Sequence, residues 1–76
     1  MRTLTCTLIF ENGSKLVAKA TANGAEDTVR IDYSGDTSRL KPFAEKGTLG
    51  FIEWYLRGCA ANAGAAIQVN HEGEFA

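Results

Sequence analysis

The chain has 76 residues, of which 45% are hydrophobic and 22% are charged, and its formal net charge is −1. This composition excludes a disordered tail, and the length predicts one domain over residues 1–76. No apolar run reaches the roughly 18 residues that a membrane span requires. Threonines interrupt the N-terminal segment where a signal peptide would be continuously apolar. We therefore expect a cytoplasmic protein that has no bulk attraction to nucleic acid or membranes.

Residues 2–11 alternate between an apolar and a threonine-rich face, which is typical of a half-buried strand. Asn12-Gly13 follows and indicates a hairpin. A two-residue loop would place lysines on the apolar face, whereas a three-residue loop with Gly13 as a left-handed bulge keeps that face apolar. We predict the second register, which pairs Leu8 with Leu16, Cys6 with Ala18 and Leu4 with Ala20.

Residues 15–22 form the second predicted strand, and its inward face carries one leucine and three alanines. Small residues at these positions allow a helix to pack close to the sheet. Residues 28–34 alternate again, with Val29, Ile31 and Tyr33 on one side and Arg30 and Asp32 on the other. The three strands predict an antiparallel meander.

The segment from Ser34 to Gly47 begins with loop residues over 35–38. Pro42 disfavours a helical conformation at the residue before it and suits the first position of a helix. We predict a short helix from Pro42 to Lys46 that ends at Gly47.

Residues 48–63, TLGFIEWYLRGCAANA, form the one long segment with helical periodicity. Thr48 suits the N-cap, and either Asn62 or Gly64 ends the helix. Gly50 and Gly58 weaken it, so packing must stabilise it. Its apolar residues form a stripe for docking on the core, which consists of Leu49, Ile52, Leu56, Cys59 and Ala63, with Ala60 beside them.

Residues 65–70 carry Ile67 and Val69 at alternate positions and predict a short fourth strand, followed by a polar tail. The predicted fold class is α+β: an antiparallel β-meander of three strands, one main α-helix packed on one face, and a short fourth strand, in the order β-β-β-α-β. Because crossover connections are right-handed, we place the last strand beside the first, giving the spatial order third, second, first, fourth.

The chain offers little for catalysis. His71 is the sole histidine and falls in the predicted tail, where we expect it to be solvated. Cys6 and Cys59 both lie on apolar stripes, which favours two buried thiols in a reducing compartment, with a disulfide as the alternative. One histidine and two distant cysteines do not make a metal site. We predict a protein that is not an enzyme and has no cofactor or metal.

The main helix has more apolar surface than one core requires. Trp54 lies roughly 160° around the helix from Ile52, and Phe51 and Tyr55 continue the apolar arc. Aromatic rings beside a glycine are typical of an interface, so we predict a partner-binding surface made by Trp54, Phe51, Tyr55 and Gly58. Its partner would be another protein or a second copy in a homodimer.

An intramolecular alternative stays open for Trp54, because three apolar residues elsewhere in the chain could fold over the helix and cover it: Pro42, Phe43 and Phe75. For Phe51 and Tyr55 we favour a place in the core.

A second alternative is a small nucleic-acid-binding module. Lys15, Lys19 and Arg30 lie on the predicted outer face of the sheet among threonines, and a sheet face can read DNA through its exposed side chains. Three basic residues provide little positive charge for binding nucleic acid, and the negative charge of Asp32 reduces it further. We rank this function below protein binding.

The hairpin residues 9–16, IFENGSKL, resemble the central hairpin of small phage-encoded anti-CRISPR proteins of the type I-F inhibitor group. The resemblance covers about ten residues, several of which belong to a common turn. It carries over no functional residue, and the predicted closing strand departs from the helical end of that group. It implies a compact, non-enzymatic inhibitor that occupies a surface of a larger nucleoprotein complex.

Overall fold

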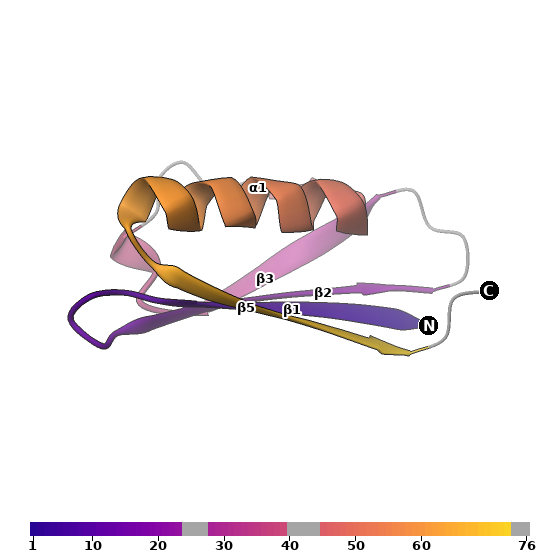
Figure 1. Ribbon diagram of the computed structural model, residues 1–76. Helices are drawn as coiled ribbons and strands as arrows, with labels where there is room; N and C mark the ends of the chain where they lie inside the picture. Colours follow the sequence, from indigo (N-terminus) through magenta and orange to yellow (C-terminus); the bar gives the residue numbers. More distant parts are fainter. Residues whose placement is uncertain (24–27, 40–44, 74–76) are drawn as a thin grey trace.

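The computed structural model describes residues 1–23, 28–39 and 45–73. One antiparallel sheet contains β1, β2, β3, β4 and β5 in the spatial order β4-β3-β2-β1-β5, and the helix α1 connects β4 to β5 (Figure 1). The elements are β1 (Arg2–Ile9), β2 (Lys15–Ala22), β3 (Val29–Gly35), the 3-10 turn η1 (Thr37–Arg39), β4 (Lys46–Gly47), α1 (Leu49–Ala63) and β5 (Ala66–Gly73). The predicted α+β class is confirmed, and β4 is an additional strand.

The first hairpin has the bulged turn that the apolar pattern requires. Gly13 has φ 87°, and its amide donates a hydrogen bond of 2.9 Å to the carbonyl of Phe10. Asn12 Oδ1 accepts hydrogen bonds from the amide and hydroxyl of Ser14, at 3.0 and 2.7 Å. The predicted register is confirmed, with Leu8 opposite Leu16, Cys6 opposite Ala18 and Leu4 opposite Ala20.

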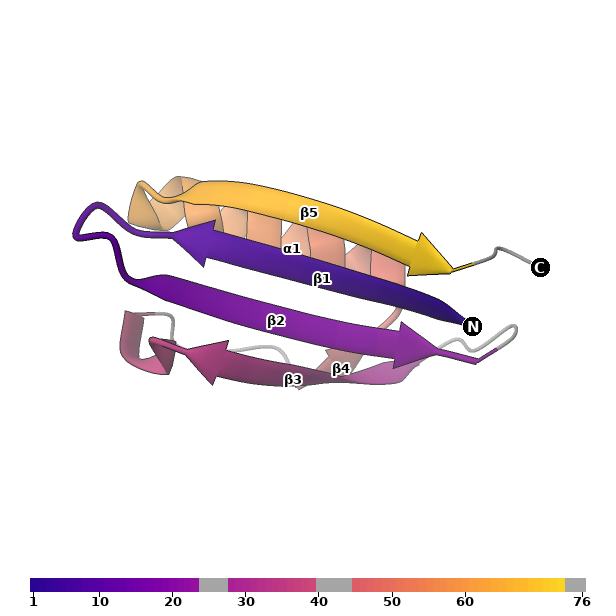
Figure 2. The same cartoon turned by 90° about the horizontal axis from the view of Figure 1, so that it is seen from below.

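The core lies between one face of the sheet and α1. Figure 1 shows the helix lying along that face, while Figure 2 shows the opposite face from below, with no helix covering it. The helix packs mainly against β1 and β5, and its buried side chains fill the space between it and the sheet. The buried apolar residues are Leu4, Cys6, Leu8, Phe10, Leu16, Ala18, Ala20, Ala22, Val29, Ile31, Ile52, Leu56 and Ala60.

The helix α1 begins and ends with side-chain and backbone caps. Thr48 Oγ1 accepts a hydrogen bond of 3.1 Å from the amide of Phe51, which confirms the predicted N-cap. Gly64 is left-handed at φ 67° and forms the C-cap, which decides between the two predicted ends. The predicted stripe is buried at its centre, but Ala63 is exposed because the chain turns away at Gly64.

The segment before α1 differs from the prediction. Thr37–Arg39 forms a 3-10 turn where a loop was expected, and Lys46–Gly47 forms β4. Most of the helix predicted from Pro42 to Lys46 lies outside the described residues, but its last residue is in a strand, so the prediction is wrong there. The cause is pairing with β3: Lys46 lies opposite Arg30 and Gly47 opposite Val29, and the Ile31 amide donates to the Glu45 carbonyl at 3.2 Å.

The last strand lies beside the first, as predicted, and is longer than expected. β5 runs to Gly73 because every residue from Ala66 to Gly73 has a partner on β1. Backbone pairing with a neighbouring strand does not require apolar side chains, so the polar end of the segment is included. His71 is therefore in a strand, and the prediction of a polar tail at this position is wrong.

Within the described ranges, no helix combines the length and the apolar character needed to cross a membrane.

Candidate functional site

Three aromatic rings lie side by side along α1, with Trp54 facing away from the sheet and Phe51 and Tyr55 partly covered by it. Phe51 is 44% exposed and Trp54 is 71% exposed, whereas Tyr55 is half-buried. The Phe51 ring centroid lies 5.9 Å from that of Trp54 and 6.1 Å from that of Tyr55, with interplanar angles of 36° and 23°. We call Phe51, Trp54, Tyr55 and Gly58 the aromatic surface. It contains no charged residue, and it brings together the four residues of the predicted partner-binding surface.

The sheet determines how far each ring is covered. A Cβ at Gly47 would lie 2.6 Å from the ring of Phe51, so the glycine of β4 leaves room for that ring against the strand. The contact covers only part of Phe51, and the prediction that it belongs to the core is wrong. Tyr55 packs against the edge of the core, which fits the prediction for that residue in part.

The exposure of Trp54 bears on the two alternatives left open by the sequence. Pro42, Phe43 and Phe75, the residues expected to cover the indole, lie outside the described residues. The part of the chain that the structure describes leaves the indole uncovered, with 71% of the residue exposed. The structure therefore favours an accessible Trp54 over one in the core.

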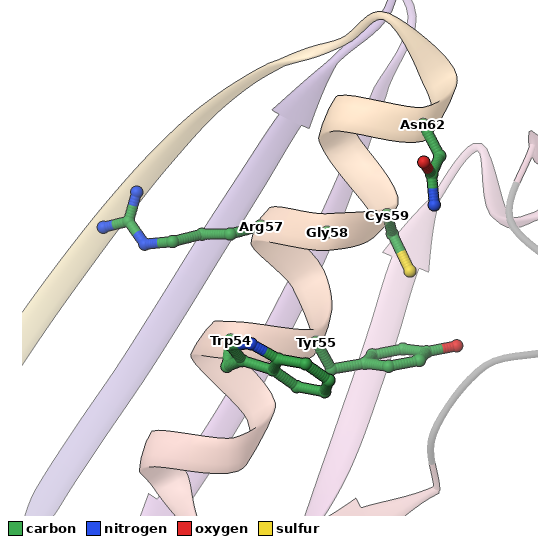
Figure 3. Close-up of a pocket in the computed structure, with 6 residues that line it drawn as sticks. All are labelled: Trp54, Tyr55, Arg57, Gly58, Cys59 and Asn62. Carbon is green, nitrogen blue, oxygen red and sulfur yellow. The ribbon is translucent and has the colours of Figure 1, made fainter.

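A hollow of about 550 Å³ lies beside the indole on the outer side of α1. Gly58 lies between Trp54 and Tyr55 at one end and Cys59 and Asn62 at the other (Figure 3). Apart from the neighbouring helix backbone, no atom lies within 4 Å of where a Cβ at Gly58 would be, so the glycine leaves open space beside the helix. The residues that line the hollow are Trp54, Tyr55, Arg57, Gly58, Cys59 and Asn62.

Sequence reasoning missed three of the lining residues, which are Arg57, Cys59 and Asn62. Asn62 follows Gly58 by one helical turn, as Gly58 follows Trp54, so the i, i+4, i+8 spacing could have placed it on this face. Cys59 was assigned to the buried stripe, but it is half-buried and borders both the core and the hollow.

A charged cluster lies on the flank of α1 toward β5. Glu53 accepts a hydrogen bond of 3.0 Å from Arg57 Nε one turn along the helix, and its other oxygen lies 2.7 Å from His71 Nε2. The hydrogen bond from Arg57 lowers the pKa of Glu53, with a further contribution from His71, while partial burial opposes both. His71 is exposed, as predicted, and its contact with Glu53 also joins β5 to the helix.

The two cysteines have different environments, and both are free thiols. Cys6 is fully buried, as predicted, and burial raises its pKa to about 11, with a further contribution from Glu53. Cys59 is half-buried at the hollow. The structure therefore agrees with the thiol prediction rather than with the disulfide alternative.

The alternative nucleic-acid face is spread along the sheet. Lys15, Lys19 and Arg30 are all exposed, but Lys19 lies directly opposite Asp32 in the β2–β3 register. Lys15 is at the hairpin end of β2, while Arg30 is beside β4 at the other end, roughly 20 Å away at 3.3 Å per residue. The structure does not gather the three into one patch, and nucleic-acid binding stays a prediction.

The described residues contain no group of three or more His, Cys, Asp or Glu side chains arranged to hold a metal ion. In the comparisons with known proteins, no family model, curated protein or solved structure matches the chain. The hairpin resemblance to anti-CRISPR proteins gains no support from them and stays a prediction.

Proposed function

We propose that this protein is a small, non-enzymatic binding protein that acts through protein–protein contacts made by the aromatic surface. The observation that carries the proposal is the exposed Trp54 indole beside a hollow whose base is Gly58. Tryptophan and tyrosine are enriched among the residues that dominate binding energy, especially where a ring can enter a pocket on the partner. The surface offers both a ring to insert and a hollow to receive one.

The geometry also limits the cost of binding. Trp54 and Phe51 contact each other and lie on a capped helix, so their positions are restricted before a partner arrives. Rigid aromatic side chains lose less conformational entropy on binding than flexible ones. Burial of a large ring contributes roughly 25 cal/mol for each Å² of apolar surface removed from water.

Affinity capture with variant baits tests the proposal. The tagged protein, Trp54→Ala and Lys19→Ala are used as baits in cells of the organism that encodes the chain, and captured proteins are quantified. We expect Trp54→Ala to lose the captured protein and Lys19→Ala, on the uncovered face of the sheet, to retain it. Thermal unfolding of each bait confirms that it is folded.

Capture that is lost with Lys19→Ala and retained with Trp54→Ala would contradict the proposal and favour the sheet face instead. Equal capture by all three baits would show that neither the aromatic surface nor the sheet face binds the captured protein.

The hairpin resemblance adds a proposed class of target, a host nucleoprotein complex inhibited by a phage protein. An interference assay tests it separately. Expression of the chain in cells with an active type I-F CRISPR system should restore plating of a targeted phage. An unchanged plating efficiency would exclude this complex as the target.

A further inference from the structure

We infer that the partner of the aromatic surface is a second copy of the same chain, paired through antiparallel α1 helices about a two-fold axis level with Leu56. This inference rests on the proposed function and specifies its partner. Closed two-fold pairing is the commonest form of self-association, and it requires a surface that is complementary to itself.

The order of large and small residues on the outer side of α1 provides that complementarity. Trp54 and Gly58 lie two positions on either side of Leu56, so the axis sets each Trp54 level with Gly58 of the second copy. Phe51 and Ala61 lie five positions on either side, so the same axis sets each Phe51 level with an alanine. Trp54 and Phe51 are thus each level with a small residue of the second copy, whereas Tyr55 is level with Arg57.

The hollow receives the ring in this arrangement. About 550 Å³ is open beside Gly58, and apart from the neighbouring helix backbone no atom lies within 4 Å of a Cβ built at Gly58. The indole of the second copy enters this space from above. Because the two copies are equivalent, each contributes one indole and one hollow, and both exposed Trp54 side chains are covered at once.

The charges around the surface are compatible with the pairing. Phe51, Trp54, Tyr55, Gly58, Ala61 and Asn62 occupy the outer side of the helix, and none of them is charged. Arg57 extends toward β5 (Figure 3), on the flank that also carries Glu53. The axis brings Arg57 to within about 3 Å, measured along the helix, of the level of Glu53 of the second copy, at 1.5 Å per residue. Arg57 of the second copy comes equally close along the helix, but each Arg57 is paired with Glu53 of its own chain, so two neutralised pairs meet on that flank.

The area of contact predicts a weak dimer. An aromatic side chain buries about 150–250 Å² at most, and α1 is only about four turns long. The interface therefore falls at the low end of the range for specific complexes, where dissociation constants are roughly micromolar.

An exchange of the large and small residues tests the geometry. Sedimentation equilibrium measures the dissociation constant of the purified protein, Trp54→Ala, Gly58→Trp and the double variant Trp54→Ala/Gly58→Trp. We expect each single variant to weaken dimerisation at least about tenfold, by 1.4 kcal/mol or more. The double variant again sets a tryptophan opposite a small residue and should recover most of the affinity.

The fluorescence of Trp54, the sole tryptophan, provides a second measurement. In the unsubstituted protein its emission should shift to longer wavelength on dilution through the same concentration range as dissociation. In the sedimentation measurement, Gly50→Trp is the comparison variant, because Gly50 also has open space at its Cβ but lies six positions from the axis, at the edge of the paired region, whereas Gly58 lies two positions from it. It should weaken the dimer less than Gly58→Trp does.

Three results would overturn the inference: a monomer at millimolar concentration, a dimer unaffected by Trp54→Ala, or a double variant no tighter than either single variant. If the protein is monomeric and Trp54→Ala abolishes capture of a different protein, the dimer is excluded but the proposed function is supported. If the protein is monomeric and Trp54→Ala does not change capture, both the dimer and the proposed function are excluded.

Discussion

The two faces of α1 have similar apolar content and opposite environments. On the inner face, Ile52, Leu56 and Ala60 are at most 1% exposed and pack on the sheet. On the outer face, Trp54 is 71% exposed although it is the largest side chain of the helix. Hydrophobicity alone therefore does not separate core from surface in this helix. The separation comes from the position of the sheet, which covers only one side.

The comparison also shows how size is arranged differently on each face. On the inner face, Ile52, Leu56 and Ala60 belong to one buried cluster with the residues of the sheet, and the space is filled. On the outer face, large residues alternate with small ones and the space beside Gly58 is left open. A filled surface contributes to the stability of the fold, whereas an open one is available to a partner.

The largest expected difference between the faces concerns truncation to alanine. Leu56→Ala should lower the free energy of unfolding by about 2–5 kcal/mol, because it leaves a cavity under the helix. Trp54→Ala should change it by only about 0.5 kcal/mol, because the ring is exposed. Urea denaturation of the monomer at low protein concentration measures both. A loss with Trp54→Ala as large as that with Leu56→Ala would place the indole in the core.

The next difference concerns added volume. Ala60→Leu should destabilise the fold by about 1–3 kcal/mol, because Ala60 is 1% exposed in a packed region. Gly58→Leu should stabilise it by up to about 1 kcal/mol, since leucine is the better helix former and the site is open. Thermal unfolding compares the two. A destabilising Gly58→Leu would show that the space beside Gly58 is filled in solution.

The thiols provide a chemical test of the same contrast. At about pH 8, Cys59 should react with a thiol reagent at least about tenfold faster than Cys6, which is fully buried and has a pKa of about 11. Cys59→Ser and Cys6→Ser proteins measure each rate alone. If the two copies pair as inferred, the rate at Cys59 should fall as protein concentration rises. Equal rates would show that the core opens readily.

The smallest effect is expected on the flank between the faces. The pKa of Glu53 is lowered in the fold, so its contribution to stability is present above its ordinary pKa of 4.5 and is lost as the pH falls through the lowered value. An exposed i, i+4 pair contributes only about 0.3–0.5 kcal/mol. Glu53→Gln should therefore lose slightly less stability than the unsubstituted protein on acidification, measured by thermal unfolding. Identical pH profiles would contradict the role of Arg57 and His71.

The local pattern of the sequence determined much of the fold. The alternation over residues 2–22 left only one turn register that keeps a face apolar, and Gly13 has the positive φ that this turn requires. Thr48 and Gly64 determined the ends of α1 through caps that depend on nearby residues alone. Such features could be predicted because their physical causes lie within a few positions of each other in the chain.

Tertiary structure decided the rest. Lys46 and Gly47 became a strand because the edge of β3 was available, and the polar end of β5 was extended by pairing with β1. The arc of aromatic residues was visible in the sequence, but which rings are exposed depends on how much of them β4 and the core cover. Exposure and long-range backbone pairing depend on elements that are distant in the chain, and local pattern does not specify them.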